Sequence, residues 1–444
     1  MFFPTETDAG IHPVFLEQAK TLVAGGELLP GGADMLAKRL HTAAETQTPL
    51  RVKLGLDPTR PDLHLGHSVV LRKLRMFQDL GHKAVLIIGD ATALIGDPSG
   101  KNQTRPPLTE AEVKANAETY LSQAGKIIDV HQAEVVRNSQ WLSTMTMADW
   151  LRLASMATVA QLLVRDDFAK RYKANQPIAL HELLYPLMQG YDSVYIRADI
   201  ELGGTDQRFN NLMGRELQQT WLQRALPSPS GLPHKPDNQM VLLMPLLEGT
   251  DGVIKMSKSY PEHCINITDA PADMFGKLMS VPDAMILRYQ QLLMPLSEAQ
   301  LAQQADAMSK SPEQGGINPR DAKAYMAKWI VAQYHGGDAG EAAEQAFVNQ
   351  FKNRQLPDDI ETTKHPAGIL QDIPEFLTQR GLTPSKAEAR RLMTGGGVKL
   401  RNPETPNDEG EKLLDPAAPL PAYTAGQSCI LQVGKRKFIQ IQFE

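Results

Sequence analysis

Two short signatures carry the residue types that phosphate chemistry needs. They are His64-Leu65-Gly66-His67 and Lys255-Met256-Ser257-Lys258-Ser259. The first follows a strand-like stretch and opens a helix, where exposed backbone amides and the helix dipole favour an anion. The second offers two ammonium groups and two hydroxyls on a loop. The pair predicts a site that holds a nucleotide polyphosphate and stabilises the negative charge that develops when it is cleaved.

His64 and His67 lie three residues apart and therefore share one face of a helix. Their ring N–H groups can donate to phosphate oxygens, and Gly66 between them leaves room for a nucleotide to approach the backbone. The alternatives are a His-x-x-His metal pair and two ordinary surface histidines. No nearby Cys or His completes a zinc set, so we expect no metal ion held by the protein here.

Lys255 and Lys258 are expected to bind the same phosphates as the two histidines, but from a flexible loop. The glycines Gly249 and Gly252 give a flexible approach to them. A loop that closes on the leaving phosphates acts chiefly in the transition state, and interactions of that kind raise the rate. A lysine-serine loop by itself is usually solvated surface. The complete five-residue pattern, following the histidine signature in one chain, favours the phosphate-binding interpretation.

A third polar segment runs over residues 96–101 with the sequence GDPSGK. It lacks the GxxxxGK spacing of a P-loop. Asp97 could bind a substrate ammonium group, while Lys101 and the nearby Arg105 could reach phosphate from a turn. Taken by itself, the segment is more typical of an ordinary polar surface turn.

Tyr185, Gln189 and Asp192 follow one another at i, i+4 and i+7, which places them on one face of a helix. Leucines surround them in the sequence, so this helix is expected to be largely buried, and buried polar groups need partners. The three side chains therefore predict either a pocket for an amino acid or an internal hydrogen-bond network.

The elements around the first signature form a β–α–β unit. Residues 51–56 alternate as a strand, residues 65–80 carry one apolar helical stripe, and residues 84–89 are an apolar run. Such a run is typical of a strand that is buried on both faces of a parallel sheet. This opening predicts an α/β fold with a doubly wound parallel sheet.

A second strand–turn–helix unit is predicted further along the chain. Residues 194–202 alternate strictly, the turn 203–207 reads GGTDQ, and residues 208–221 have a helical pattern. Thr109 and Glu112 form a capping box before a helix that reaches toward Ile128. The remaining predictions are helical patterns over 147–172, 183–189 and most of 269–351, a loop over 226–238, and an α+β segment from 369 that ends in a strand over 437–443.

Composition limits the class of protein. The chain has 444 residues, of which 42% are hydrophobic and 22% charged, as in ordinary globular proteins. It has no run of 18 apolar residues, and its first ten residues hold two acids and no Lys or Arg, so neither a membrane span nor a secretory signal is expected. The cysteines Cys264 and Cys429 are expected to be free thiols in a reducing compartment, which favours the cytoplasm.

The net charge of −5 gives no general attraction for nucleic acid, but basic residues gather near the end of the chain. These local clusters, rather than the overall charge, would decide contact with phosphate. Solvated surface is the equally open alternative. The residues are Lys386, Arg390, Arg391, Lys399, Arg401, Lys435, Arg436 and Lys437.

The two signatures, in this order, resemble the HIGH and KMSKS motifs of class I aminoacyl-tRNA synthetases. The block 51–67, GDPSGK, YPLMQGYD at 185–192 and GGTDQ are similar to the tyrosyl-tRNA synthetase family, and the segments 383–392 and 431–438 resemble the RNA-binding module of its bacterial members. The resemblance implies the following divisions: a Rossmann-like catalytic domain over 1–265 with an inserted helical dimerisation segment at about 109–172, a helical anticodon-binding domain over 266–354, a linker over 355–368, and a small α+β RNA-binding domain over 369–444.

The resemblance also implies substrates and residue roles. ATP with Mg²⁺ on its phosphates, L-tyrosine and tRNA(Tyr) would be bound by a homodimer that has no membrane segment. Tyrosine would be bound by Asp97, Tyr185, Gln189, Asp192 and Gln207. ATP would be bound by Gly55, Asp57, His64, Gly66, His67, Gly204, Asp206, Lys255, Met256, Ser257, Lys258 and Ser259. Catalysis would fall to His64, His67, Lys101, Arg105, Lys255 and Lys258, and tRNA contact to the eight basic residues of the tail.

One position departs from the family. Many of its members have a tyrosine four residues before the aspartate that is Asp57 here, and this chain has Lys53. The residue that joins Asp192 at the phenol hydroxyl is therefore left open. The rival interpretations are a tryptophanyl-tRNA synthetase, a small-molecule nucleotidyltransferase of the pantothenate-synthetase kind, and a catalytically silent RNA-binding relative.

Overall fold

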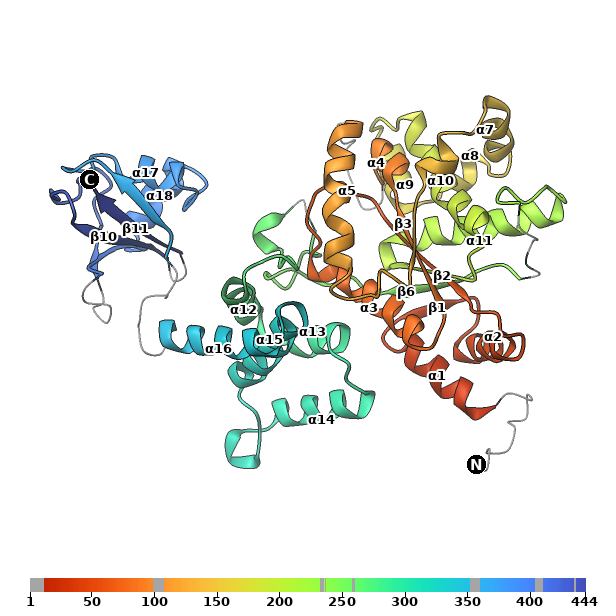
Figure 1. The fold of residues 1–444 in the computed structure, drawn as a ribbon, viewed down its shortest axis with the longest axis horizontal. Coiled ribbons are helices and arrows are strands. Elements are labelled where there is room, and N and C mark those ends of the chain that lie inside the picture. The colour runs from red at the N-terminus through yellow and green to blue at the C-terminus, as the bar shows by residue number, and fades with distance from the viewer. Residues whose placement is uncertain are drawn as a thin grey trace. The chain divides into compact units, whose positions relative to one another are not determined.

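The fold comprises two compact units, which the computed structural model describes over residues 12–98, 108–231, 235, 237–257, 260–351, 360–403, 410–434 and 437–444 (Figure 1). The first unit consists of Met1–Asp269 and Ser280–Met326. The second consists of Ala270–Met279 and Ala327–Glu444.

A six-stranded sheet organises the first unit, with the strand order β1-β6-β5-β2-β3-β4. Five strands are parallel, and β1 pairs antiparallel with β6 at one edge. Chain connections leave in opposite directions from β2, so the order reverses between β2 and β5, which is where α/β sheets place their ligands. The strands are β1 (Glu27–Leu29), β2 (Arg51–Leu56), β3 (Lys83–Ile88), β4 (Glu134–Arg137), β5 (Ile200–Gly204) and β6 (Met240–Met244).

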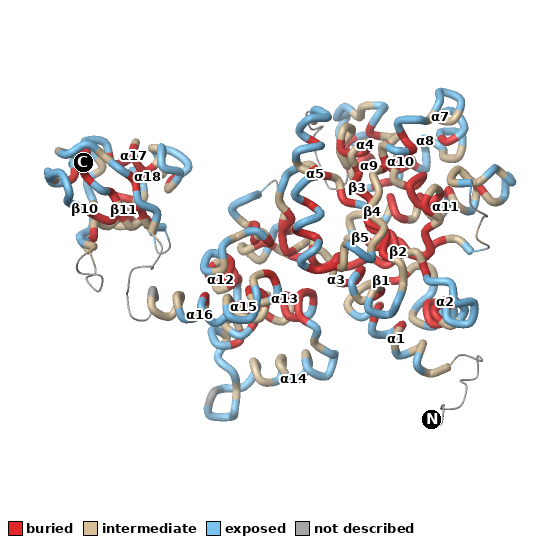
Figure 2. The backbone as a smooth tube through the Cα atoms, in the orientation of Figure 1, coloured by how far each residue is buried: buried red, intermediate tan, exposed pale blue. Residues whose placement is uncertain are grey.

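Helices pack around this sheet, and the buried residues follow the strands and the helix faces turned toward them (Figure 2). Both β3 and β6 are almost wholly apolar and buried, as parallel strands covered on both faces require. The helices are α1 (Pro13–Val23), α2 (Ala33–Glu45), α3 (Leu65–Asp79), α4 (Asp90–Ile95), α5 (Glu110–Ala124), α6 (Ser139–Leu142), α7 (Met147–Ala154), α8 (Val159–Leu163), α9 (Asp166–Lys173), α10 (Leu180–Ile196), α11 (Arg208–Gln223), α13 (Ile286–Leu293) and α14 (Glu298–Ser309).

The second unit contains helices followed by a small α+β module. The helices are α12 (Pro271–Ser280), α16 (Gly337–Phe351) and α15 (Pro319–His335), whose first turns belong to the first unit. The module has a sheet of order β7-β11-β10-β8-β9 and its own apolar core. Its elements are β7 (Thr362–His365), α17 (Ile373–Gln379), α18 (Lys386–Thr394), β8 (Val398–Arg401), β9 (Glu411–Lys412), β10 (Ser428–Val433) and β11 (Lys437–Phe443).

The fold class predicted from the sequence is confirmed: a doubly wound parallel sheet, then helices, then an α+β module. Strands β2 and β11 have the predicted bounds. The capping box before α5 is present, since Thr109 Oγ1 accepts from Glu112 N while the Glu112 carboxylate accepts from Thr109 N. Across the described ranges no helix is long and apolar enough to cross a membrane.

The predicted strand over 194–202 is wrong in its first half. Helix α10 continues through Val194 to Ile196, Arg197 ends it in the left-handed conformation at φ 57°, and β5 begins at Ile200. The cause is burial: α10 is buried on most sides, so an apolar residue at every second position does not distinguish it from a strand. Strands β4 and β6, and the breaks that divide 147–172 into three helices, were not predicted.

Candidate active site

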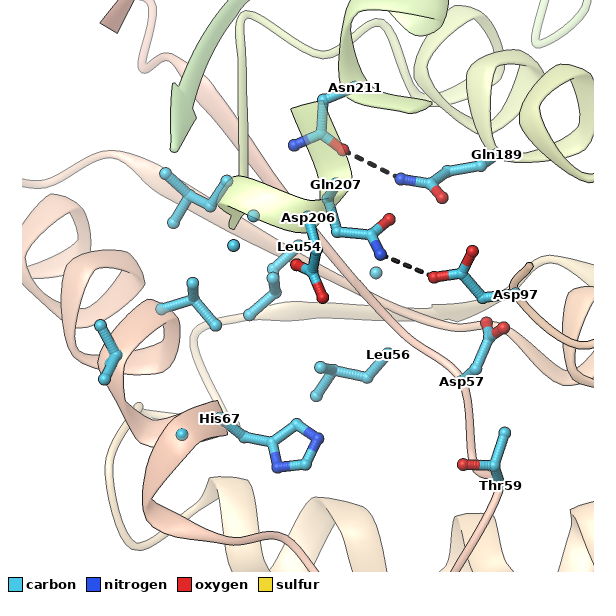
Figure 3. A pocket seen from close by; sticks show the side chains of 18 of the residues that line it. Leu54, Leu56, Asp57, Thr59, His67, Asp97, Gln189, Asp206, Gln207 and Asn211 are labelled. Atoms are coloured by element: carbon cyan, nitrogen blue, oxygen red, sulfur yellow. Dashed lines mark hydrogen bonds between the residues drawn. The ribbon is translucent and has the colours of Figure 1, made fainter. Parts of the chain in front are cut away.

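A cleft of about 300 Å³ opens at the carboxyl ends of β2, β3, β5 and β6. Its lining includes residues of both signatures and most of the other predicted residues that the structure describes, and Figure 3 shows part of this lining. Gly55 faces open space, because a Cβ added there would meet no atom within 4 Å. The predicted residues that line the cleft are Gly55, Asp57, His64, Gly66, His67, Asp97, Tyr185, Gln189, Asp192, Gly204, Asp206, Gln207, Lys255, Met256 and Ser257.

The histidines of the first signature cap helix α3. His64 is the N-cap residue, and its Nδ1 accepts from Gly66 N at 3.1 Å, while His67 Nδ1 accepts from His64 N at 3.2 Å. Because Nδ1 is an acceptor in both rings, each neutral imidazole carries its proton on Nε2. The ring centroids are 3.9 Å apart. The capping box thus fixes the tautomer and makes Nε2–H the donor of each ring.

The second signature meets the turn after β5. Lys255 Nζ lies 2.8 Å from Asp206 Oδ2, and both side chains are partly exposed to the cleft. Cys264 Sγ donates to Ser257 O at 3.1 Å, and this hydrogen bond attaches the loop to the segment that follows it. Figure 3 shows His67 and Asp206 pointing into the same space. Lys101, Arg105, Lys258 and Ser259 lie outside the described residues.

The carboxylate of Asp57 accepts two hydroxyl donors. Tyr185 donates to Asp57 Oδ2 at 2.8 Å, and Thr92 donates to Asp57 Oδ1 at 2.8 Å. Burial raises the pKa of the Tyr185 hydroxyl well above its usual value, and the nearby Asp57 carboxylate raises it further. Tyr185 is therefore a neutral donor that fixes the aspartate at the end of β2.

Asp192 is buried at 3% exposure and lies within hydrogen-bond reach of two donors. Trp141 Nε1 donates to its Oδ1 at 2.8 Å, and Asn138 Nδ2 donates to its Oδ2 at 3.2 Å. Burial raises the pKa of the Asp192 carboxyl to about 7, although Lys53 and the two donors oppose that rise. Near neutral pH this group is poised between the acid and the carboxylate.

The remaining polar residues of the cleft are paired with one another (Figure 3). Gln207 Nε2 donates to Asp97 Oδ2 at 2.6 Å. Gln189 Nε2 donates to Asn211 Oδ1 at 2.9 Å. Both the pocket and the hydrogen-bond network that the sequence allowed are therefore present at the same residues, and the network holds the side chains that line the pocket.

Lys53 does not line the cleft. Its side chain is buried, with Nζ 2.7 Å from Glu201 Oε1, 2.8 Å from Ser193 Oγ and 3.0 Å from Gln189 O. The ammonium group that replaces a tyrosine at this position is thus part of an internal ion pair beneath α10. Among the described residues, the side chains that donate hydrogen bonds to Asp192 are those of Asn138 and Trp141.

Thr92, Asn138, Trp141 and Asn211 are among the polar residues around the cleft that sequence reasoning missed. Asn138 directly follows β4, whose two valines are a short strand signal at the carboxyl edge of the sheet. That signal could have predicted Asn138, because residues that follow parallel strands gather at that edge. The other three sit on helices, where nothing in the local pattern marks them.

Six of the eight basic residues predicted to contact tRNA belong to the described part of the chain, and they lie on α18, β8 and β11. Lys386 is ion-paired with Asp372 and Glu375, Arg391 pairs with Glu388 at 2.7 Å, and Lys437 Nζ donates to Leu382 O. Arg401 is largely buried. Lys435 and Arg436 lie outside the described residues.

Residues 45–352 match the model of the tRNA synthetases class I (W and Y). This match covers more than half of the chain, and the cleft that holds both signatures falls within it. The chain therefore belongs to the class I aminoacyl-tRNA synthetases, enzymes that activate their amino acid with ATP. Relatives then narrow the assignment.

The chain is 47% identical over 422 residues to the tyrosine–tRNA ligase of Carboxydothermus hydrogenoformans, covering 94% of this chain and 95% of the relative. It is 48% identical to that of Nitrosospira multiformis, covering 92% and 94%. It thus belongs to the tyrosine–tRNA ligases, with tyrosine and tRNA as the substrates of the family.

Solved structures share the fold. A C-terminally truncated mitochondrial tyrosyl-tRNA synthetase of Aspergillus nidulans matches with a TM-score of 0.60 at 21% identity, covering 76% of this chain and 94% of that one. A tyrosyl-tRNA synthetase of Archaeoglobus fulgidus complexed with L-tyrosine matches with a TM-score of 0.56 at 19% identity, covering 74% and 99%. At these identities the likeness supports the architecture alone.

Proposed function

We propose that the cleft joins L-tyrosine to ATP, releases pyrophosphate, and then transfers the tyrosyl group to the terminal adenosine of tRNA(Tyr). The observation that carries this proposal is the position of Asp192, a buried acceptor in a cleft whose mouth holds the capped histidines and Lys255. A phenol hydroxyl donates to such a carboxylate. A phenyl ring supplies no such donor, and the hydrogen bond to the charged group that is lost contributes about 1.5–3 kcal/mol.

In the first step the tyrosine carboxylate attacks the α-phosphorus of ATP. Asp97, beside Gln207, receives the tyrosine ammonium, and Gln207 contacts the carboxylate. Gly55 gives the adenylate access to the sheet edge, and Asp57 and Asp206 lie beside the nucleotide, with Asp206 and Gly204 at its ribose. The Nε2–H groups of His64 and His67 donate to oxygens on which charge develops, and Lys255 exchanges its contact with Asp206 for the leaving phosphates.

The other predicted phosphate contacts extend the same arrangement. Met256, Ser257, Lys258 and Ser259 belong to the closing loop, and Lys101 and Arg105 complete the cationic surroundings of the phosphates. Mg²⁺ would enter on the nucleotide and neutralise part of its charge. Within the described ranges no group of three or more His, Cys, Asp or Glu is arranged to hold a metal ion.

The second step requires tRNA, and we assign its recognition to the second half of the chain. The helices over 266–354 are the candidates for the anticodon contact, and the α+β module that contains β7 is the candidate for a further RNA contact. The basic residues Arg390, Lys399, Lys437, Lys435 and Arg436 are its main candidates for phosphate. Lys386 and Arg391 would have to exchange their present acidic partners for RNA.

We further propose a homodimer that forms through the segment over 109–172. Large apolar side chains are exposed on consecutive helices there, a pattern typical of an interface. The exposed fractions are 74% for Met147, 65% for Leu151, 60% for Val159, 74% for Val164 and 66% for Tyr172, and Leu180, which follows the segment at the start of α10, is 77% exposed.

Both cysteines are free, which fits a reducing compartment and hence the cytoplasm.

ATP–pyrophosphate exchange with each of the twenty amino acids tests the activity directly. Tyrosine is expected to drive exchange, and phenylalanine and tryptophan to drive it far more weakly. Exchange driven by tryptophan alone would refute the assignment. Charging of tRNA(Tyr) with labelled tyrosine then tests the second step.

A further inference from the structure

Arg165 is a buried arginine outside the cleft that the mechanism above does not use. It precedes α9, and its side chain is 5% exposed. Its guanidinium lies 5.1 Å from the ring centroid of Phe168 and 5.9 Å from that of Phe209. A buried cation needs partners that compensate its desolvation, and two of the partners of Arg165 connect it to the cleft.

The polar contacts of Arg165 close a ring through two residues of the cleft. Its Nη2 lies 3.5 Å from Asp97 Oδ1, and its Nη1 donates to Asn210 Oδ1 at 3.0 Å. Asn210 Nδ2 donates to Gln207 Oε1 at 3.0 Å, and Gln207 Nε2 donates to Asp97 Oδ2 at 2.6 Å. Each side chain in this ring is oriented by both of its neighbours.

A fifth residue adds a negative charge to the ring. Asp167 Oδ1 lies 2.6 Å from Arg165 Nε, and Asp167 Oδ2 has no hydrogen-bond partner among the described residues. One guanidinium and two carboxylates leave a net charge of −1. That charge is complementary to one ammonium group. Without the guanidinium, two carboxylates would lie close together in a partly buried place, and one of them would take up a proton.

We propose that Arg165 is a positioning residue for tyrosine recognition, acting through Asp97. It orients the Asp97 carboxylate for the substrate ammonium and compensates the charge of the nearby Asp167 carboxylate. This inference rests on the proposed function, in which Asp97 binds the ammonium. A planar guanidinium reaches Asp97, Asn210 and Asp167 at once, which a lysine ammonium cannot do from one position.

The test separates ammonium recognition from the rest of the substrate. Arg165→Met is compared with the unaltered enzyme for the tyrosine and ATP KM in pyrophosphate exchange, and for the Kd of 3-(4-hydroxyphenyl)propanoate, which is tyrosine without its ammonium. The tyrosine KM is expected to rise about tenfold to a hundredfold, as for a displaced binding group. The ATP KM and the Kd of the ammonium-free compound are expected to stay within about twofold, because Arg165 contacts neither subsite.

Arg171→Met is the matched control. Arg171 lies on α9, the helix that Arg165 precedes, is similarly buried, and pairs with Glu182 at 2.5 Å. It should lower stability and leave the tyrosine KM unchanged. If both variants change tyrosine binding equally, or if Arg165→Met weakens tyrosine and the ammonium-free compound alike, Arg165 is a structural residue and the inference is wrong.

Two further variants keep the outcome clear. Asp97→Asn should raise the tyrosine KM; if it does not, the proposed role of Asp97 fails, whatever Arg165 does. If Asp97→Asn has its effect and Arg165→Met has none, only the inference fails. Should Arg165→Met not fold, Arg165→Met with Asp167→Asn removes the uncompensated carboxylate, and the same comparison is made against Asp167→Asn alone.

Discussion

The burial of Asp192 sets the pH range in which its carboxyl group changes charge. Asp192 is almost fully buried, and its pKa is raised to about 7 by that burial, against the opposing influence of Lys53, Trp141 and Asn138. Above pH 7 the carboxylate accepts from a phenol hydroxyl. Below pH 7 the protonated carboxyl gains a donor and loses part of its capacity to accept.

This titration predicts how amino-acid selectivity depends on pH. Between pH 8 and pH 6 the tyrosine KM should rise as Asp192 takes up its proton, while the phenylalanine KM stays level, because both substrates share the same ammonium and carboxylate. Pyrophosphate exchange measured across this range checks the expectation. Asp192→Asn should remove the pH dependence and lower the preference for tyrosine by about tenfold to a hundredfold. A parallel change for both amino acids would point to another group.

The buried pair of Lys53 and Glu201 gives a second prediction at this scale. Removing one member leaves an uncompensated buried charge, so Lys53→Met should lower the unfolding free energy by about 3–5 kcal/mol. Lys53→Met with Glu201→Gln should recover most of that loss. Thermal or urea unfolding of the single and double variants measures the coupling. Equal loss in the double variant would contradict an ion pair that acts as a unit.

Single residues also mark where sequence reasoning succeeds and where it stops. His64 and Lys255 could be placed in one site because each belongs to a motif whose local context defines its position. Lys53 could not, because whether a residue of β2 faces the cleft or the helix behind it depends on α10, which packs there from a distant part of the chain. Arg165 follows an exposed valine and carries no local mark of its role.

At the scale of elements, Gly66 at the N-terminus of α3 and Gly55 on β2 both line the cleft, but a methyl group would have a different effect at each. A Cβ at Gly66 would meet His64 Nδ1 at 2.9 Å, whereas a Cβ at Gly55 would meet nothing within 4 Å. Gly66→Ala should therefore displace the capping ring, with a stability loss of about 1 kcal/mol and a lower kcat. Gly55→Ala should leave stability unchanged and raise the ATP KM, because its methyl group enters the cleft.

Melting temperatures and exchange kinetics of the two variants check this contrast. An unchanged kcat in Gly66→Ala would show that the orientation of His64 does not matter for activation. Equal melting temperatures would show instead that α3 tolerates the displaced ring without loss of its cap.

Elements with strong local signals were predicted correctly, whereas the C-terminal end of the buried helix α10 was not. The alternation of β2 and the cap of α5 are local, so the chain segment suffices to define them. Helix α10 is covered by other elements on most sides, and a sequence that is apolar all round has no periodicity that separates helix from strand. Only the packing of α10 against α11 and the sheet decides its length.

At the scale of the whole molecule, the exposed apolar residues of α7 to α10 predict the assembly state. Leu151→Glu with Val164→Glu should convert the proposed dimer to monomer, because two charges would be buried without partners at the interface. Analytical ultracentrifugation measures the mass directly. Leu414→Glu, at a similarly exposed leucine of the C-terminal module, is the control and should leave the mass unchanged. A dimer that survives the first change must form through another surface.

The C-terminal module permits a clean separation of the two proposed steps. Its apolar core consists of residues between Leu370 and Phe443, so a chain that ends at residue 359 keeps every residue that lines the cleft. Pyrophosphate exchange should stay within about twofold of the full chain, since separate cores contribute independently. Charging of tRNA(Tyr) should fall, because the module carries basic side chains for phosphate.

The dependence on salt identifies the cause of that fall. Removing one ionic interaction with an RNA phosphate reduces the slope of log affinity against log salt by roughly one. The shortened chain should therefore show a shallower rise of the tRNA KM with salt than the full chain does, and Lys399→Glu with Arg390→Glu should reproduce part of the difference in a chain of full length. If charging and its salt dependence are the same with and without the module, phosphate binding lies entirely in the preceding residues, and the module must serve another purpose.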